Sequence, residues 1–436
     1  MTNKRVAITG VGPISSVGIG IDEFWANLLE GKSGIKKITR FNPEAFSNQV
    51  AGEIEGFSAR KCVPKSYRKA VKVMARDIEL AVGAADAAFR DSGIETKGTS
   101  DEPTIESRRL GCNIGAGLIC CELDEMGLAA TTAVTEGKFD LKAWGEAGMQ
   151  NLTPLWLLKY LPNMLSCHVT IIHGAEGPSN CITCGDAASH LGVGESAIYI
   201  KRGAADAVIT GGAESKLNLL GHYRPTMMGR LCATSNDNPE GAVKPFDKNH
   251  DGTVIGEGGG LLILEDMDRA TQRDANIYAE VVGFGAACDP KGIVLENPTA
   301  GNLGQAALSA IKSAGITPDD IDAIFATGTG VPGEDNAEAA EWKKVFGEKL
   351  AEIPACSITA ATGTAFAGNG GLQLVAAAKS VQDQTLPPTL NFETPAEGCE
   401  LNLSTEARKV DIEYIITGTF TVGGQSGVCV LKKVEA

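Results

Sequence analysis

The sequence predicts an α/β protein in which a mostly parallel sheet is flanked by helices. Short apolar segments that end in Gly-rich turns alternate with segments of helical spacing. A similar series of segments occurs twice, over residues 1–266 and 275–436. The chain has 436 residues, of which 43% are hydrophobic, and this is enough to bury a large core.

In the first half, five stretches are typical of strands or of helices. "RVAITGVG" (5–12) is expected to form a buried strand, and "IDEFWANLLEG" (21–31) has helical spacing with a Gly stop. "RRLGCNIGAG" (108–117) and "DAVITGGAES" (206–215) are expected to run from strands into Gly-rich turns. "SAIYIKRGAA" (196–205) is expected to be the end of a helix.

The second half is expected to repeat the pattern of the first, starting with a strand in "ANIYAEVVGFGAA" (275–287). Residues 180–200 have a counterpart in residues 355–378, because each stretch reads as an apolar strand, a small-residue turn and a helix. Residues 260–266 and 427–434 are matching terminal strands. Two related α/β halves side by side are therefore predicted.

One stretch fits neither half. Residues 125–160 contain Trp144, Trp156 and several glycines, and their pattern does not belong to a strand–helix unit. We expect a cap or lid that is inserted into the N-terminal half.

The composition excludes several classes of function. The formal net charge of −15 disfavours binding to nucleic-acid phosphates and to anionic membranes. No stretch has the length and apolar character of a signal peptide or a membrane span, and the twelve Cys lie in apolar contexts, so a cytoplasmic protein with reduced thiols is expected. Cys181 and Cys184 form a lone CxxC without the further ligands of a zinc site, and neither a metal nor a cofactor is expected.

Five stretches resemble the β-ketoacyl-acyl-carrier-protein synthases of the elongating type, which have the thiolase fold. They are "RVAITGVGPISSVGIGIDEFWANLLEGKSGI" (5–35), the segment from Gly177 to Ser215, "NDNPEGAVKPFDKNHDGTVIGEGGGLLILED" (236–266), "TLPPTLNFETPAEGCELNL" (385–403) and "FTVGGQSG" (420–427). The resemblance covers nearly the whole chain. It implies a five-layer αβαβα domain and an obligate dimer that pairs through residues 160–185.

The family's chemistry needs a Cys at the start of a buried helix, which takes the acyl chain as a thioester. Two His on loops of the second half assist malonyl decarboxylation, and a Lys near the second His orients them. Aligned with these motifs, Asp186 stands at the nucleophile position and Thr327 at the first His. Thr359 and Thr364 stand at the Lys and the second His.

These replacements predict a protein that cannot condense. A carboxylate is a poor nucleophile toward a thioester, and Thr neither carries a positive charge nor titrates near neutrality. Each lost group typically lowers the rate by about 10²–10⁴. Whether the protein catalyses another reaction is left open.

Several single residues permit two interpretations. Asp186 is interpreted first as a helix N-cap in a site that no longer reacts, and second as a charge that excludes malonyl groups or binds a new ligand. His190 lies one helical turn further on, where it either forms an acid/base pair with Asp186 or packs as part of the helix. Cys184 lies two residues before Asp186 and is either a shifted nucleophile or a small buried core residue. Phe420 and Val422 are expected in the wall of the acyl pocket, where many family members carry a Phe gate at the position of Val422.

A basic stretch stands out in this acidic chain. Lys65, Arg68, Lys69 and Lys72 lie where the family docks acyl carrier protein, which is strongly acidic. A solvated helix face would explain the same charges.

Three hypotheses for function follow from the resemblance and its departures. The first is a partner of an active ketosynthase, similar to the chain-length factors of polyketide systems. The second is an acyltransferase with altered chemistry at Asp186, His190 or Cys184. The third is a homodimer that binds an acyl chain or acyl carrier protein without catalysis.

Overall fold

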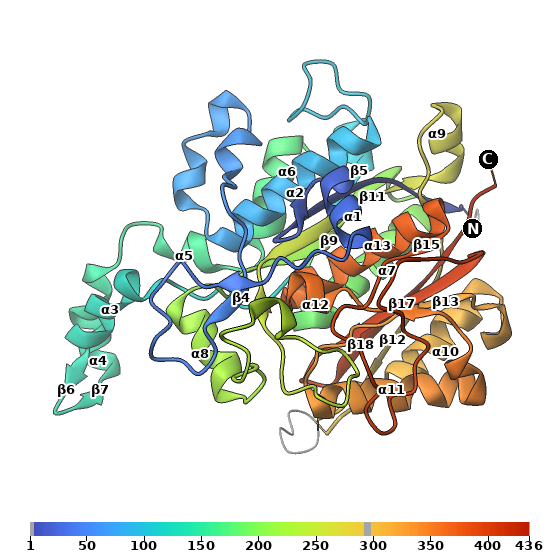
Figure 1. The fold of residues 1–436 in the computed structure, drawn as a ribbon. Helices are drawn as coiled ribbons and strands as arrows, with labels where there is room; N and C mark the ends of the chain where they lie inside the picture. Colours follow the sequence, from blue (N-terminus) through green and yellow to red (C-terminus); the bar gives the residue numbers. More distant parts are fainter. Residues whose placement is uncertain (1–3, 292–297, 436) are drawn as a thin grey trace.

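The computed structural model describes residues 4–291 and 298–435, and its strands form one large sheet and three small ones within these ranges. Figure 1 shows the large sheet crossing the molecule, with helices on both sides. Ten of its strands lie, in spatial order, as β14 (Ala355–Cys356), β13 (Ala323–Phe325), β17 (Tyr414–Phe420), β18 (Gln425–Lys432), β12 (Ala279–Cys288), β1 (Val6–Ser15), β11 (Gly258–Asp266), β9 (Ala207–Glu214), β5 (Leu110–Ala116) and β8 (Ser179–Thr183), and the short β2 (Gly18–Ile19) pairs with β1 outside this order.

The strand order repeats in the two halves of the chain. Numbered by their sequence within each half, the five strands on either side of the β1–β12 contact follow the order 3-2-4-5-1. β1 and β12 pair over only two residue positions, at Ala7 with Glu280 and Ile8 with Ala279. The internal repeat in the sequence pattern therefore corresponds to a repeat in topology.

The sheet is mixed, and the expectation of a mostly parallel sheet was wrong. β5 is parallel to β8 and β9, and β13 is parallel to β14 and β17, because helical crossovers connect these strands. The pairs β9–β11, β11–β1, β1–β12, β12–β18 and β18–β17 are antiparallel. In each half, the chain enters the last strand (β11 or β18) at the same end of the sheet where the preceding strand (β9 or β17) finished. The last strand therefore runs antiparallel to the strand before it.

Helices and half-sheets alternate in the five layers that the resemblance implied. The outer helices of the first half are α2 (Arg76–Ser92) and α6 (Met164–His173), and those of the second half are α10 (Leu303–Ala314) and α11 (Pro332–Phe346). Between the half-sheets lie α7 (Ala188–Lys201) and α13 (Asn369–Asp383), which pack against each other and against strands of both halves.

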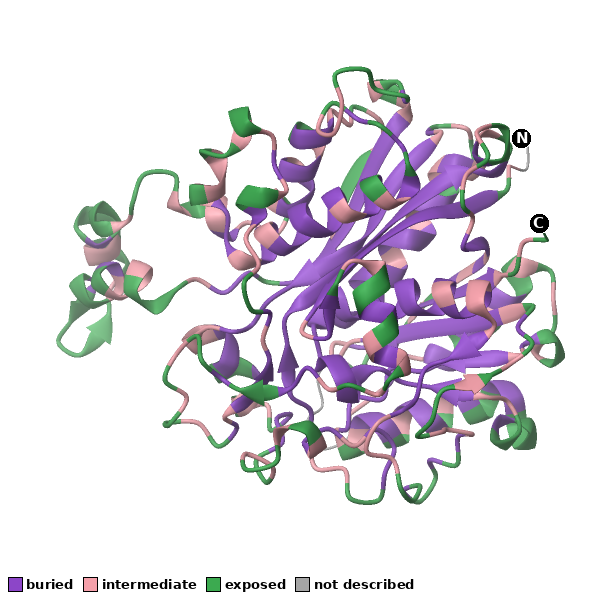
Figure 2. Ribbon diagram, turned by 45° about the horizontal axis from the view of Figure 1, so that its top comes forward, coloured by how far each residue is buried: buried purple, intermediate pink, exposed green. Residues whose placement is uncertain are grey.

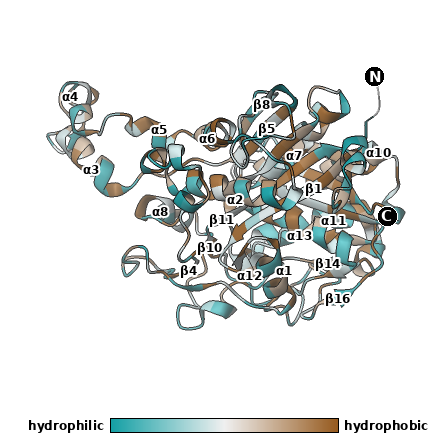
Figure 3. Cartoon of the chain, turned by 90° about the horizontal axis from the view of Figure 1, so that it is seen from above, coloured by the Kyte–Doolittle hydropathy of each residue, from teal (hydrophilic) through white to brown (hydrophobic). Residues whose placement is uncertain are grey.

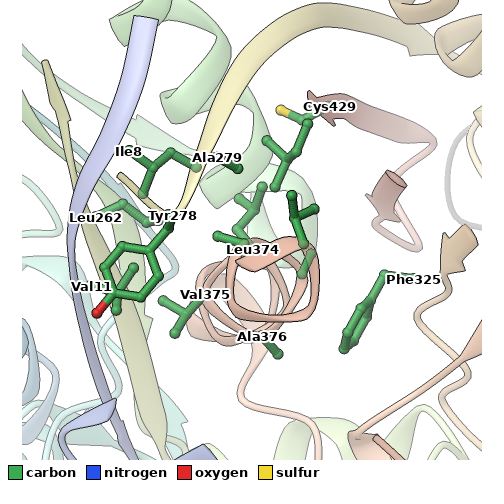
Figure 4. Packing of buried hydrophobic residues seen from close by; sticks show 14 of the residues in the cluster. Ile8, Val11, Leu262, Tyr278, Ala279, Phe325, Leu374, Val375, Ala376 and Cys429 are labelled. Atoms are coloured by element: carbon green, nitrogen blue, oxygen red, sulfur yellow. The ribbon is translucent and has the colours of Figure 1, made fainter. Parts of the chain in front are cut away.

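The central core surrounds α13. Figure 4 shows Leu374 and Val375 of this helix among side chains from both halves, including Ile8 and Phe325. Two glycines permit the close approach of helix and sheet: a Cβ on Gly260 of β11 would lie 2.3 Å from the backbone of Gly371. This contact brings the start of α13 next to the start of α7, and Figure 2 shows that the middle of the molecule is buried throughout.

Within the stretch 125–160, for which a cap or lid is predicted, most of the chain belongs to an arm that projects from the body of the protein (Figures 1 and 2). We use "arm" for residues 123–151, which form α3 (Leu123–Thr132), β6 (Val134–Thr135), β7 (Lys138–Phe139), α4 (Leu141–Glu146) and a final 3-10 turn (Gly148–Asn151). The short helix α5 (Trp156–Tyr160) then leads back to α6.

The remaining elements connect these layers. They include α1 (Ile21–Leu29), α8 (Leu219–Met227), α9 (Met267–Gln272), α12 (Thr359–Thr362), and the small strands β3 (Lys36–Lys37), β4 (Val50–Gly52) and β10 (Ile255–Gly256). Within residues 4–291 and 298–435, no helix is both long enough and apolar enough to cross a membrane.

Candidate functional site

The site predicted from the motifs begins where β8 ends. The chain leaves this strand, forms a 3-10 turn over Gly185–Ala187, and then enters α7. Gly185 has a φ of +50°, a left-handed conformation that glycine adopts without strain. Asp186 follows it and is 4% exposed.

Asp186 is not a helix cap, so the first interpretation of this residue was wrong. The N-cap position of α7 is held by Ala187, and no side chain accepts a hydrogen bond there. The 3-10 turn places Asp186 one residue too early to reach the free N–H groups of the helix. Its Oδ1 atom is buried and has no hydrogen-bond partner among the described residues.

The surroundings of Asp186 are charged. Burial raises the pKa of its carboxyl to about 6; Arg230 acts in the opposite direction, and Glu334 and Glu214 raise the pKa further. Arg230 follows α8, and its guanidinium donates to both carboxylate oxygens of Glu334 on α11, at 2.7 and 2.9 Å. Arg230 and Glu334 are both buried. A carboxyl without a direct partner therefore lies beside a buried ion pair that is already satisfied.

A second charged cluster adjoins the first. Glu214 at the end of β9 accepts a hydrogen bond from Ala367 N at 2.8 Å and forms an ion pair with buried Lys216, whose Nζ also donates to Leu118 O at 2.6 Å. Asp77 lies nearby, and burial raises the pKa of its carboxyl to about 7.

The structure brings Thr327 and Thr359 together. The Oγ1 of Thr359 donates to the carbonyl oxygen of Thr327 at 2.7 Å, and Ser357 Oγ donates to the same oxygen at 2.7 Å. Thr327 Oγ1 in turn donates to Gly418 O at 3.0 Å. These side chains are buried, and their hydroxyl groups are used in structural hydrogen bonds.

Glu338 on α11 holds the loop that carries Thr327. Its two carboxylate oxygens accept hydrogen bonds from the backbone N–H groups of Thr327 and Gly328, at 2.8 and 2.9 Å. Trp342 Nε1 donates to it as well, at 3.1 Å. Burial raises the pKa of Glu338 to about 7, although these hydrogen bonds act in the opposite direction.

Thr364 is fixed by a different partner. Its Oγ1 lies 2.6 Å from Thr253 Oγ1, and its N–H donates to Val254 O at 2.8 Å. Thr364 is fully buried. Thr364, which is assigned to the family's second His position, therefore carries a neutral hydroxyl group, and it links α12 to the loop before β10.

His190 does not pair with Asp186. Its Nδ1 lies 3.0 Å from Thr419 Oγ1 and its Nε2 lies 3.2 Å from Thr417 Oγ1, both on β17. Burial lowers the pKa of His190 to about 3, so the ring is neutral at physiological pH. A neutral ring held between two hydroxyls binds α7 to the second half-sheet.

The other predicted pocket residues have separate surroundings. Cys184 is half-buried, and burial raises the pKa of its thiol, with Cys288 and Asp186 adding to the effect, so the reactive thiolate is disfavoured. Phe420 packs in the core of the second half, against the α10–α11 layer, and Val422 is half-buried in the turn after β17.

The basic residues lie on the surface, in two 3-10 turns before α2. Lys65, Arg68, Lys69 and Lys72 are exposed, and none of them forms an ion pair with another described residue. Arg76, at the end of the same stretch, is instead held by Glu257 at 2.8 Å.

Sequence reasoning missed Arg230, Glu334 and Glu338. The signal for the two glutamates was the stretch "GVPGEDNAEAAE", which follows Thr327 closely and starts a helix. Arg230 lies 104 residues from its partner, and no local pattern marks it.

The fold is the thiolase-like fold of the ketoacyl synthases. The model of the family described as "Beta-ketoacyl synthase, N-terminal domain" matches residues 3–270, and that of "Beta-ketoacyl synthase, C-terminal domain" matches residues 278–393. The chain belongs to the beta-ketoacyl synthase family, which confirms the resemblance seen in the motifs.

Similar proteins cover the chain from end to end. The 3-oxoacyl-[acyl-carrier-protein] synthase 2 of Coxiella burnetii is 33% identical, with 100% of both chains covered. That of Staphylococcus aureus is 33% identical and covers 100% of this chain and 99% of its own.

Solved structures give the same result. "The ishigamide ketosynthase/chain length factor" has a TM-score of 0.84 and 26% identity, with 99% of this chain and 100% of that chain covered. A beta-ketoacyl synthase from Burkholderia phymatum has a TM-score of 0.86 and 25% identity over the same shares. A type II polyketide ketosynthase in complex with its acyl-carrier protein has a TM-score of 0.82 and 26% identity, again over 99% and 100%.

Proposed function

We propose that this protein is a beta-ketoacyl synthase-like subunit of fatty acid or polyketide synthesis that does not condense acyl chains itself. In this proposal it pairs with an active ketosynthase, as a chain-length factor does. The observation that carries the proposal is the buried carboxyl of Asp186 at the nucleophile position, together with hydroxyl groups of Thr327 and Thr364 that are engaged in structural hydrogen bonds.

The chemistry of these groups supports the absence of condensation. Covalent loading of an acyl chain needs a thiolate, which forms a thioester, or a hydroxyl with a base beside it, which forms an ester. Asp186 offers neither group, and its buried Oδ1 atom has no hydrogen-bond partner among the described residues. The two Thr hydroxyls are neutral and cannot stabilise an enolate as an imidazole or imidazolium can. The scaffold around these positions is nevertheless fully formed.

Similarity to a ketosynthase/chain-length-factor pair supports the role as a partner. Within the large sheet, β8 is the terminal strand and leaves one edge without a hydrogen-bonded neighbour among the described strands. An open edge of this kind is normally covered. We propose that the second subunit covers it, along residues 160–185.

The charge of the surface supports docking of an acyl carrier protein. Lys65, Arg68, Lys69 and Lys72 present positive charge that no acidic residue of the described chain neutralises, which favours an acidic partner. One of the similar structures holds an acyl-carrier protein on its ketosynthase. The carrier would deliver its acyl chain to the partner's thiol.

The test is covalent loading. The purified chain and its Asp186→Cys variant are incubated with an acyl–acyl-carrier-protein and analysed by intact-mass spectrometry. We expect no acyl adduct on the natural chain and an adduct on the variant, because a thiol at the start of α7 regains the nucleophile. An adduct on the natural chain would contradict the proposal and support altered chemistry at Asp186 or Cys184.

The partner role has its own measurement. The chain is co-expressed with a ketosynthase that carries an intact Cys–His–His site, and native mass spectrometry counts the subunits. A heterodimer supports the proposal. Separate homodimers would contradict it and would favour a binding protein that works without a catalytic subunit.

A further inference from the structure

The arm has regular secondary structure although it buries almost none of its own side chains. Of residues 123–151, only Ala129, Ala133 and Gly148 are buried, and all three are small. Figures 1, 2 and 3 show from three directions that the arm stands away from the body. A module of fewer than about 40 residues rarely has a sufficient core of its own.

The arm exposes large apolar side chains instead. Leu141 is 78% exposed and Leu128 is 63% exposed. The other large apolar side chains exposed in the arm or just after it are Leu123, Val134, Phe139, Met149, Leu155 and Leu157. Large apolar side chains gathered on and beside one projecting module mark a protein-interaction site rather than an ordinary solvated surface.

The base of the arm is held firmly. Glu125 at the start of α3 accepts a hydrogen bond from Tyr160 Oη at 2.8 Å and forms an ion pair with Lys159. At the far end, Asp140 caps α4 by accepting hydrogen bonds from Lys142 N and Ala143 N, at 2.7 and 3.2 Å. The arm therefore presents its apolar side chains from a fixed position.

The arm continues along the side of the molecule that carries the open edge of the sheet. Figure 3 shows α3, α5, α6 and β8 one after another along one side, and α6 packs on both α5 and β8. Ile171 on α6 is also exposed. The arm and the β8 edge thus form one extended face of the molecule.

The charge of the arm disfavours two other occupants, an anionic membrane and an acidic carrier protein. Residues 123–151 contain five acidic and two basic side chains, a net charge of −3. This charge repels an anionic membrane and an acidic carrier protein. A neutral apolar protein surface remains as the complement.

We propose that the arm is a clasp that lies on the second ketosynthase-fold subunit and holds the pair together. The inference rests on the proposed pairing of subunits and adds the element that secures it. In the assembled pair, the apolar side chains of the arm pack on the partner's surface beyond the strand β8.

The test measures association of the full chain, alone and co-expressed with a ketosynthase that has an intact site. In the variant Leu128→Glu/Leu141→Glu, both changed side chains are solvent-exposed, so the fold should remain intact. Leu308→Glu on α10, at a residue that is 41% exposed, serves as the matched control. Circular dichroism checks that both variants fold.

We expect the double variant to raise the dissociation constant of the pair by about 100-fold or more in sedimentation velocity, and the control to leave it unchanged. Hydrogen exchange should show the amides of residues 123–151 protected in the pair and released in the double variant. An unchanged dissociation constant, or a chain that stays monomeric under both conditions, would overturn the clasp.

These outcomes are separate from those of the proposed function. A homodimer that loads acyl groups and weakens with the double variant would refute the non-condensing role and leave the clasp in place. A heterodimer that is indifferent to the double variant would refute the clasp alone.

Discussion

The carboxyl of Asp186 should make the stability of this protein depend on pH in a calculable way. Burial raises the pKa of this group from an ordinary 3.8 to about 6 in the folded protein. The folded state therefore binds a proton more tightly than the unfolded state, and stability falls as pH rises between these two values. One pKa unit corresponds to about 1.4 kcal/mol, so the full effect is about 3 kcal/mol.

The perturbation that isolates this effect is Asp186→Asn, which cannot ionise. The amide has hydrogen-bonding needs of its own, but their cost does not vary with pH. The difference in free energy of unfolding between the variant and the natural chain should therefore grow in the variant's favour as pH rises, by about 3 kcal/mol over the whole titration and by about 2 kcal/mol between pH 4 and pH 7. Roughly half of the whole change develops between pH 5 and pH 8.

Urea unfolding at a series of pH values measures the difference, with the protein concentration held constant because association shifts apparent stability. Asp101→Asn, at an exposed acidic residue, is the control and should show no such trend. A difference between the Asp186 variant and the natural chain that stays constant with pH would refute the reasoning. It would mean that the carboxyl is solvated or paired in solution.

Two further predictions concern charges elsewhere. Arg230→Met should lower the free energy of unfolding by about 3–5 kcal/mol, because it leaves buried Glu334 without a partner. Adding Glu334→Gln should restore much of this loss in the same urea assay. If stability does not recover, the loss comes from packing and not from charge. Lys65→Glu/Lys69→Glu should weaken binding of an acyl carrier protein by about tenfold in surface plasmon resonance at low salt, with the difference shrinking at high salt. Lys312→Glu on α10 should bind like the natural chain, and equal weakening by both variants would argue against a local docking surface.

Much of the fold could be predicted from the sequence because its central strands are buried on both faces. Such strands leave continuous apolar runs, as in residues 260–266 and 427–434, and these runs correspond to β11 and β18. Strand direction could not be predicted in the same way. The long connection between β9 and β11 contains helices and loops, and its pattern does not reveal at which end of the sheet it returns.

For the site, the sequence provides an assignment but not its geometry. The assignment of Asp186 and the three threonines to the family's catalytic positions rests on their flanking motifs and stays a prediction. They did not reveal that a 3-10 turn moves Asp186 out of the cap position. The ion pair of Arg230 with Glu334 depends on tertiary packing, so local spacing carries no trace of it.

The middle layer has a consequence for synthesis on the ribosome. The inner face of the first half-sheet is covered partly by α13, and this helix ends only at Asp383. A nascent chain that has reached Asp266 has all five strands of its first half, but it must wait while more than one hundred further residues are made. At about 5–20 residues per second, the wait is on the order of 10 s, during which an apolar sheet face is open to water and to other chains. The order in which the helices are encoded thus leaves this face of the first half-sheet incompletely covered during translation, until the last helix is made.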